Sequence, residues 1–158
     1  MIENNSEILA ENDNNIIVIK YKYLKLENLV NINNKLYYDN LLFNLQTPVF
    51  NNYNIISMFG TKYLKLNVNL AKIKHVKFLN IVETIEKKIN KNIPIKTQII
   101  KDNTNISLKI KLNSNLKLYN KDKVEITDLL SKFKIILLLK FEINENYYSI
   151  ICNQILEL

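Results

Sequence analysis

The feature that most constrains the fold is a run from Thr61 to Leu70 in which apolar and polar side chains alternate. The apolar positions are Leu64, Leu66, Val68 and Leu70. The positions between them are Tyr63, Lys65, Asn67 and Asn69. Because successive side chains of a strand point to opposite faces, this alternation predicts a strand with one buried and one exposed face. A tyrosine and a lysine would then lie together on the exposed face.

That exposed face has two interpretations. Single aromatic residues are common on solvated protein surfaces and need no function. A tyrosine beside a lysine also suits an unpaired nucleic-acid strand, because a base can stack on the ring while the ammonium group attracts a phosphate. The choice depends on whether other parts of the chain repeat the pairing.

Length and composition indicate one globular domain. The chain has 158 residues, of which 47% are hydrophobic and 23% are charged. No apolar run approaches the roughly 20 residues that a membrane-spanning helix needs. The N-terminus lacks the basic start and apolar core of a secretion signal, and the lone Cys152 suits a reducing compartment. We expect an intracellular soluble protein with a flexible acidic leader over residues 1–15 and a single β-rich domain over residues 16–158.

The charge is distributed unevenly along the chain. The net charge is +7, and all 22 basic residues are lysine. The leader holds four of the 15 acidic residues and no lysine, so the remaining chain has 22 positive against 11 negative charges, or +11. A basic body favours a polyanionic partner, nucleic acid first. The leader either competes with that partner or only aids solubility, and A/T-rich codons account for part of the lysine and asparagine excess.

Hydrophobic periodicity predicts one helix among many strands. In residues 73–89, the apolar side chains Phe78, Val82, Ile85 and Ile89 recur at helical spacing, ahead of Pro94. Strands are expected over residues 16–26, 36–38, 41–46, 61–70, 95–100, 106–112, 116–119, 134–143 and 147–158, with a loop over 51–54 and a helical turn within 122–132. Asparagine-rich turns are expected at 31–34, 39–40, 113–115 and 144–146, because asparagine tolerates a left-handed backbone. The order predicts a mainly β fold, an antiparallel β-barrel or sandwich with one long helix covering one end.

The residues that catalysis or metal binding requires do not form a set in the sequence. His75 is the only histidine and stands among lysines at the start of the helix, where we expect a surface or half-buried ring. Cys152 alternates with apolar residues and is expected to pack as a small core residue. Glu83 and Glu86 are expected to face lysines on the helix, and the single glycine is too little for a phosphate-binding loop. The sequence therefore predicts no enzyme, no catalytic residue, no metal site and no cofactor.

Pairs of an aromatic residue and a lysine recur on three expected strands, which favours the nucleic-acid interpretation. The expected binding residues are Tyr21, Lys22, Tyr23, Lys25, Tyr63, Lys65, Lys109, Lys111, Lys117 and Tyr119. Stacking is insensitive to base identity, whereas reading a duplex relies largely on arginine, of which the chain has none. We therefore expect salt-sensitive, sequence-nonspecific binding of single-stranded DNA or RNA.

Short motifs between Leu41 and Leu158 resemble a known family. The motifs are Gln46-Thr47-Pro48, Phe59-Gly60 and Gln154 in the final expected hairpin. With these motifs the chain, from Leu41 to Leu158 with a gap in the middle, resembles small proteins of nucleocytoplasmic large DNA viruses that are similar to OB-fold single-stranded DNA-binding proteins. It departs from them at Tyr147 and Tyr148, where the family tends to have tryptophan, and at Asn146, which replaces a glycine.

The resemblance implies an OB-like barrel that protects unpaired DNA during viral replication or packaging, in the host cytoplasm, a viral factory or the virion. A rival hypothesis is a protein-interaction module, in which a sheet edge or the outer residues Ile17 and Ile19 pair with another chain. Its partner would be a second copy, giving a homo-oligomer, or a viral replication or virion protein. The two hypotheses are compatible, because a barrel can bind a strand and also self-associate through an edge.

Overall fold

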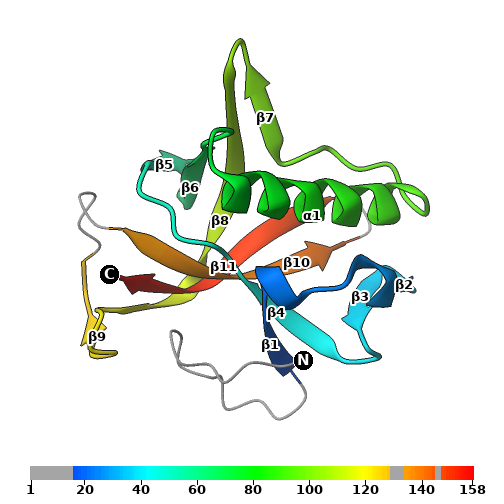
Figure 1. The fold of residues 1–158 in the computed structure, drawn as a ribbon, viewed down its shortest axis with the longest axis horizontal. Coiled ribbons are helices and arrows are strands. Elements are labelled where there is room, and N and C mark those ends of the chain that lie inside the picture. The colour runs from blue at the N-terminus through cyan, green and yellow to red at the C-terminus, as the bar shows by residue number, and fades with distance from the viewer. Residues whose placement is uncertain (1–15, 129–133, 145–146) are drawn as a thin grey trace.

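The computed structural model describes residues 16–128, 134–144 and 147–158. Within these ranges the chain forms mostly strands, with one α-helix (Figure 1). The strands are β1 Ile16–Lys20, β2 Leu29–Ile32, β3 Lys35–Tyr38, β4 Leu42–Gln46, β5 Tyr53–Met58, β6 Thr61–Val68, β7 Ile99–Asp102, β8 Asn105–Tyr119, β9 Glu125–Ile126, β10 Ile135–Ile143 and β11 Tyr148–Glu157. The helix is α1 Ile73–Asn90, and two short 3-10 segments span Tyr21–Tyr23 and Leu26–Asn28.

One large sheet forms the body of the protein. Its strand order is β1-β4-β10-β11-β8-β6-β5, and β7 and β9 also pair with β8, while β2 and β3 form a separate two-stranded sheet. The β1–β4 and β11–β8 pairs are parallel, whereas the other pairs among the described strands are antiparallel. The predicted class, a mainly β, OB-like fold with one long helix, is confirmed. The sheet is therefore mixed, because it contains the parallel pairs β1–β4 and β11–β8 beside its antiparallel pairs.

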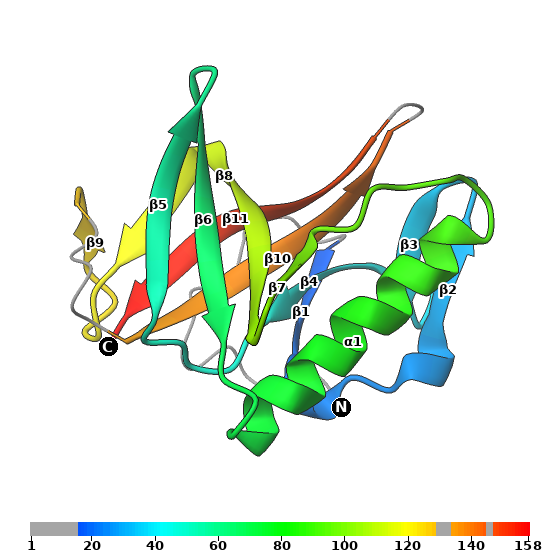
Figure 2. The same cartoon turned by 90° about the horizontal axis from the view of Figure 1, so that it is seen from above.

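The helix α1 lies across one face of the sheet and closes the core (Figure 2). Phe78, Val82, Ile85 and Ile89, the residues that predicted the helix, are all 0% exposed. They pack in one cluster with apolar side chains of β6, β8, β10 and β11. Each large side chain buried in this way contributes about 1.5–3 kcal/mol. This burial fixes the face of the sheet that is turned away from solvent.

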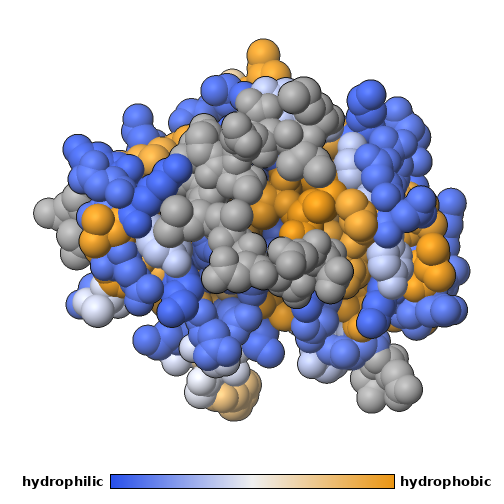
Figure 3. Space-filling model, turned by 90° about the horizontal axis from the view of Figure 1, so that it is seen from below, coloured by the Kyte–Doolittle hydropathy of each residue, from blue (hydrophilic) through white to orange (hydrophobic). Residues whose placement is uncertain are grey.

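A smaller apolar cluster lies apart from the main core. It consists of Val18, Ile136, Leu138 and Leu156, with Tyr119 packed against them. In β10, residues 135–139 are all buried, and they divide between the two clusters. The expectation that this apolar strand is covered on both faces is therefore confirmed. Seen from below, an apolar area lies near the middle of the surface, with hydrophilic side chains to its right (Figure 3).

The strand that carries the alternating pattern forms as predicted. In β6 the side chains of Leu64, Leu66 and Val68 are buried, and the alternate ones are half-buried. Leu70 lies beyond the end of the strand and is 50% exposed. Several turns place asparagine at positive φ in place of glycine, as predicted for so glycine-poor a chain. These residues are Asn33, Asn34, Asn40 and Asn103.

Other expected elements are wrong in their bounds. The strand predicted over 16–26 ends at Lys20, since its pairing with β4 ends at Gln46, just ahead of Pro48. The loop predicted over 51–54 overlaps β5, which the sequence analysis missed. The strand predicted over 95–100 shares only Ile99 and Ile100 with β7. The two strands predicted over 106–112 and 116–119 are one strand, β8. In place of the expected turn, its pairing with β11 shifts register between Leu112 and Lys117, opposite Asn153.

Some predictions fall outside the described residues. These are the acidic leader over 1–15, residues 129–133 of the helical turn expected within 122–132, and residues 145–146 of the final turn. In the described part of that helical turn, Glu125 and Ile126 form β9.

Candidate nucleic-acid interface

Four of the predicted binding residues come together on the outer face of β6 and β8. We call Tyr63, Lys65, Lys109 and Lys111 the tyrosine–lysine face. Lys111 lies directly across from Tyr63 in the antiparallel pair, and Lys109 lies directly across from Lys65. The ammonium group of Lys109 lies 4.4 Å from the centre of the Tyr63 ring. All four side chains are half-buried, so each keeps contact with solvent.

The register of the two strands produces this grouping. Leu64 and Leu66 face the core opposite Ile110 and Leu108, so the residues between them must point outward on both strands. Residues directly opposite in an antiparallel pair have Cβ atoms about 5 Å apart. The periodicity of each strand predicted its outward residues, but only the register shows that they are neighbours.

The predicted group at the N-terminus does not form a second surface of this kind. Tyr21 is 8% exposed, and its ring packs edge-on against Phe78 with ring centres 6.5 Å apart. The prediction that Tyr21 stacks a base is therefore wrong, because the chain leaves the β1 ladder at this residue and turns its ring into the core. Lys22 lies 5.1 Å from the ring of Tyr23, and Lys25 is exposed. These three side chains lie on the 3-10 segment and the turn after it, not on a strand.

The predicted pair on the C-terminal part of β8 has structural contacts. The Lys117 ammonium lies 3.7 Å from a Glu125 carboxylate oxygen across the β8–β9 pair. Tyr119 packs against the smaller apolar cluster. Neither residue lies opposite a residue of β6 in the register of the sheet.

His75 is buried, contrary to the expectation of a surface or half-buried ring. It is 2% exposed, and its ring lies 4.2 Å from that of Phe50. The Asn69 backbone N–H donates to Nδ1 over 2.9 Å, which leaves Nε2 to donate to the Val49 carbonyl, also over 2.9 Å. Burial lowers the pKa of His75, and the charge of Lys72 lowers it further, against the opposing effect of the Val49 hydrogen bond. The neutral ring thus connects α1, through its two hydrogen bonds, to the loops that contain Val49 and Asn69.

The other titratable candidates are also buried. Cys152 is 0% exposed, and burial raises the pKa of its thiol to about 12, which confirms its prediction as a core residue. Glu86 does not face lysines, because it is buried and accepts hydrogen bonds from the Thr97 hydroxyl and the Gln98 backbone N–H. Burial, with Glu86 nearby, raises the pKa of Tyr148. None of these groups is presented to solvent as a reactive side chain.

The sequence analysis missed a second group of lysines. Lys20, Lys72, Lys74 and Lys134 line one cleft together with Lys22, the only member that had been predicted. A signal was present in the sequence, because lysines at 72 and 74 precede the apolar face of the helix where acidic residues are preferred. We call the cleft that these five lysines line the lysine cleft.

The described residues contain neither a metal-binding cluster nor a helix suited to crossing a membrane. In residues 16–128, 134–144 and 147–158, no three His, Cys, Asp or Glu side chains lie close enough to hold a metal ion. Among the helices in these ranges, none is long and apolar enough to cross a membrane.

Comparison with known proteins adds little beyond the fold. No family model matches the chain, and a search of curated proteins gave no match. Three solved structures of the single-stranded DNA-binding protein from bacteriophage Enc34 are similar. They are the protein itself (TM-score 0.48, 13% identity, 82% of this chain and 88% of that chain), its complex with ssDNA (0.46, 11%, 62% and 71%) and a C-terminal truncation (0.44, 13%, 61% and 69%). With such values the likeness assigns neither a family nor a ligand, and the viral resemblance drawn from the sequence stays a prediction.

Proposed function

We propose that this chain is a non-enzymatic protein that binds single-stranded nucleic acid, DNA above all, without sequence preference. The observation that carries the proposal is the tyrosine–lysine face, where Lys65, Lys109 and Lys111 surround one half-buried aromatic ring. Three ammonium groups attract the phosphates of a strand, and the ring offers a surface for a base.

The contact between Lys109 and Tyr63 also suits this role. In the free protein the ammonium group lies over the ring at 4.4 Å, a cation–π distance. A base that stacks on this ring face displaces the ammonium group toward the phosphate beside it. Stacking of one base contributes about 1–3 kcal/mol and does not depend on which base is bound.

The biological setting follows from the sequence resemblance alone. That resemblance extends the proposal to protection of unpaired DNA during replication or packaging of viral DNA. The net charge of +11 outside the leader agrees with a polyanionic partner.

The test is binding of fluorescently labelled oligo-dT at increasing salt, with oligo-rU as competitor. The wild-type protein should bind with micromolar or lower Kd, and Tyr63→Leu should weaken binding by about 1–3 kcal/mol, or roughly 5- to 150-fold. Tyr37→Leu is the matched control, because Tyr37 is also half-buried but lies on β3, in the other sheet. No binding at low salt, or equal losses in the two variants, would rule the proposal out. Stronger competition by oligo-rU would make RNA the ligand.

A second candidate function is self-association through the edge strand β5. β5 ends the strand order of the sheet, and Ile55, Ile56 and Met58 on it are 48%, 39% and 43% exposed. Phe59 follows at the tip and is fully exposed. Ile17 and Ile19 were predicted to be outer residues that pair with another chain, and this prediction is wrong because both pack against the core. A homo-oligomer on size exclusion that persists in high salt, and that Ile56→Lys dissociates, would support this function.

A further inference from the structure

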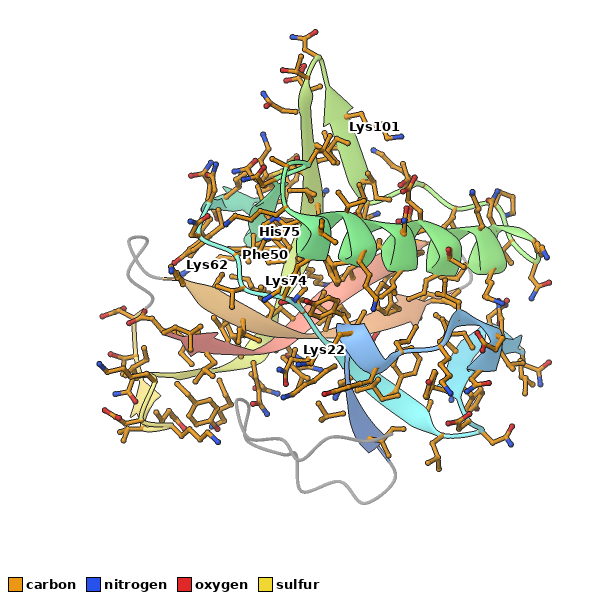
Figure 4. All side chains as sticks on the ribbon, viewed as in Figure 1. Lys22, Phe50, Lys62, Lys74, His75 and Lys101 are labelled. Atoms are coloured by element: carbon orange, nitrogen blue, oxygen red, sulfur yellow. The ribbon has the colours of Figure 1, made fainter. Side chains whose placement is uncertain are left out.

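A cleft at the N-terminal end of α1 concentrates positive charge. It has a volume of about 830 Å³, and five of its lining residues are lysines: Lys20, Lys22, Lys72, Lys74 and Lys134. None of the described residues that line it is Asp or Glu. Figure 4 shows Lys74, His75 and Phe50 at this end of the helix with Lys22 below them, whereas Lys101 lies apart from them on β7.

A second cleft of similar size shows that this concentration is specific to the first. The second cleft, of about 900 Å³, lies between the β5–β6 hairpin and β8, and among its lining residues Lys62 and Lys111 are balanced by Asp128 and Glu142. Among the described lining residues, the lysine cleft therefore has five lysines and no acidic side chain, whereas the comparable hollow has two lysines and two acidic side chains.

The position of the lysines works against the stability of the helix. Lys72 is the N-cap residue and Lys74 lies in the first turn, where no acidic residue is present. The N-terminal end of a helix carries a partial positive charge, so lysines there are unfavourable unless an anion is bound. Lys20 adds a charge that is only 8% exposed. An anionic ligand in the cleft would offset the cost of placing Lys72 and Lys74 at the start of the helix.

The apolar part of the lining indicates what kind of anion fits. Ile73 is 86% exposed and Val49 is 38% exposed, and both line the cleft beside the lysines. Apolar surface next to clustered ammonium groups suits a nucleotide unit, whose phosphate meets the lysines while its sugar and base contact the apolar side chains. A bare inorganic anion would leave this apolar surface unused.

We propose that the lysine cleft is a phosphate-binding site that holds nucleotide units of the unpaired strand, separate from the tyrosine–lysine face. In this form the inference rests on the proposed function, and it adds a second point of contact along the strand. No residue is shared between the lining of the cleft and that face.

The single histidine of the chain provides a direct reporter. His75 lines the cleft, so its ring resonance in a proton–carbon NMR spectrum is unambiguous and close to the ligand. Titration of the full chain with oligo-dT at pH 7.5 should shift this resonance in step with binding. Pyrophosphate alone should shift it at higher concentration, and polyglutamate should not.

Two double variants on the same helix distinguish binding in the cleft from a general effect of net charge. Lys72→Gln/Lys74→Gln removes two charges at its start, and Lys87→Gln/Lys88→Gln removes two at its end. The first variant should lose the His75 shift and weaken oligo-dT binding on the order of tenfold at 0.1 M salt, with a log–log salt slope smaller by about 1.4, equivalent to two phosphates. The second should keep the shift and bind within about twofold of the wild type.

The outcomes distinguish this inference from the proposed function. Equal losses in the two double variants, or oligo-dT binding that leaves His75 unmoved, would overturn the cleft while leaving the tyrosine–lysine face intact. If oligo-dT fails to bind but pyrophosphate moves His75 in a Lys72- and Lys74-dependent way, the phosphate site stands and the strand-binding function falls. An equal response to polyglutamate would show an unspecific basic surface and overturn the proposal.

Discussion

Two segments of nearly the same composition have opposite fates in this structure. Residues 20–23 read Lys-Tyr-Lys-Tyr and residues 62–65 read Lys-Tyr-Leu-Lys. In the second segment Tyr63 lies half-buried on the outer face of the sheet, in contact with Lys109. In the first segment Tyr21 is turned inward against Phe78. A tyrosine among lysines is thus a surface residue in one place and a core residue in the other.

The difference lies in how many partners each strand has. β6 pairs on both sides, with β5 and β8, so its alternation of faces holds along its whole length. Among the described strands β1 has one partner, β4, and that ladder ends at Lys20. Without a ladder the backbone enters a 3-10 turn, and burial of the nearest large ring determines where Tyr21 points.

Tyr21→Ala and Tyr63→Ala should give the largest contrast between the two segments. Loss of the packed Tyr21 ring should lower the free energy of unfolding by about 3 kcal/mol, as for other large-to-small core changes. Loss of the half-buried Tyr63 ring should cost less than about 1 kcal/mol. Urea unfolding followed by circular dichroism measures both.

Nucleic-acid binding should rank the same two variants in the reverse order. Folded Tyr21→Ala protein, measured well below its melting temperature, should lose less oligo-dT affinity than Tyr63→Ala, because the Tyr21 ring is packed in the core against Phe78 even though the residue also lines the lysine cleft. Tyr63→Ala should weaken binding. A destabilised Tyr63→Ala protein with unchanged affinity would show that both rings are structural.

The contrast also marks how far the sequence could predict the molecule. The helix and the outward residues of β6 follow from periodicity, because each pattern is long enough to outweigh local exceptions. Tyr21 could not be placed, since the end of the β1 ladder depends on β4, a strand more than twenty residues further along. The contact of Tyr63 with Lys109 and the assembly of the lysine cleft from five segments depend on the tertiary structure, which no single window of sequence contains.

His75 tests how tightly the aromatic corner that holds Tyr21 is packed. The rings of Tyr21, Phe78, Phe50 and His75 contact one another in that order. His75→Phe should keep the ring packing but leave the Asn69 N–H and the Val49 carbonyl without their partner, at a cost of about 2 kcal/mol at neutral pH. Thermal unfolding at pH 7.5 measures this cost.

The pH dependence of the same pair of proteins has a definite sign. Because burial lowers the pKa of His75 in the folded state, the unfolded chain binds more protons below about pH 6.5. The stability that the neutral ring provides is therefore complete above pH 6.5 and is lost as the pH falls toward the lowered folded pKa. The difference in unfolding free energy between the wild type and His75→Phe should shrink from pH 7 to pH 5. A constant difference over that range would show that the ring is not held neutral.

In the exposed segment around Tyr63, Lys109→Gln should have a smaller effect on stability than the changes above. Removal of the cation–π contact with Tyr63 should lower the unfolding free energy by about 0.5–1 kcal/mol. It should also reduce the log–log salt slope of oligo-dT binding by about 0.7, the value for one phosphate contact. Lys101→Gln, on β7, provides the matched loss of one exposed charge. An equal change of slope in both variants would mean that Lys109 acts only through net charge.

Lys117→Gln should have the smallest effect, although Lys117 lies on the same strand as Lys109. Its ion pair with Glu125 is largely solvated, with side chains 53% and 60% exposed, and such pairs contribute at most a few tenths of a kcal/mol. Within β8, only the N-terminal half pairs with β6, so Lys117 has no tyrosine of β6 opposite it. The affinity for oligo-dT should therefore change by less than about twofold. A loss as large as that of Lys109→Gln would extend the binding surface along β8, past the residues that pair with β6 and into the part that pairs with β9.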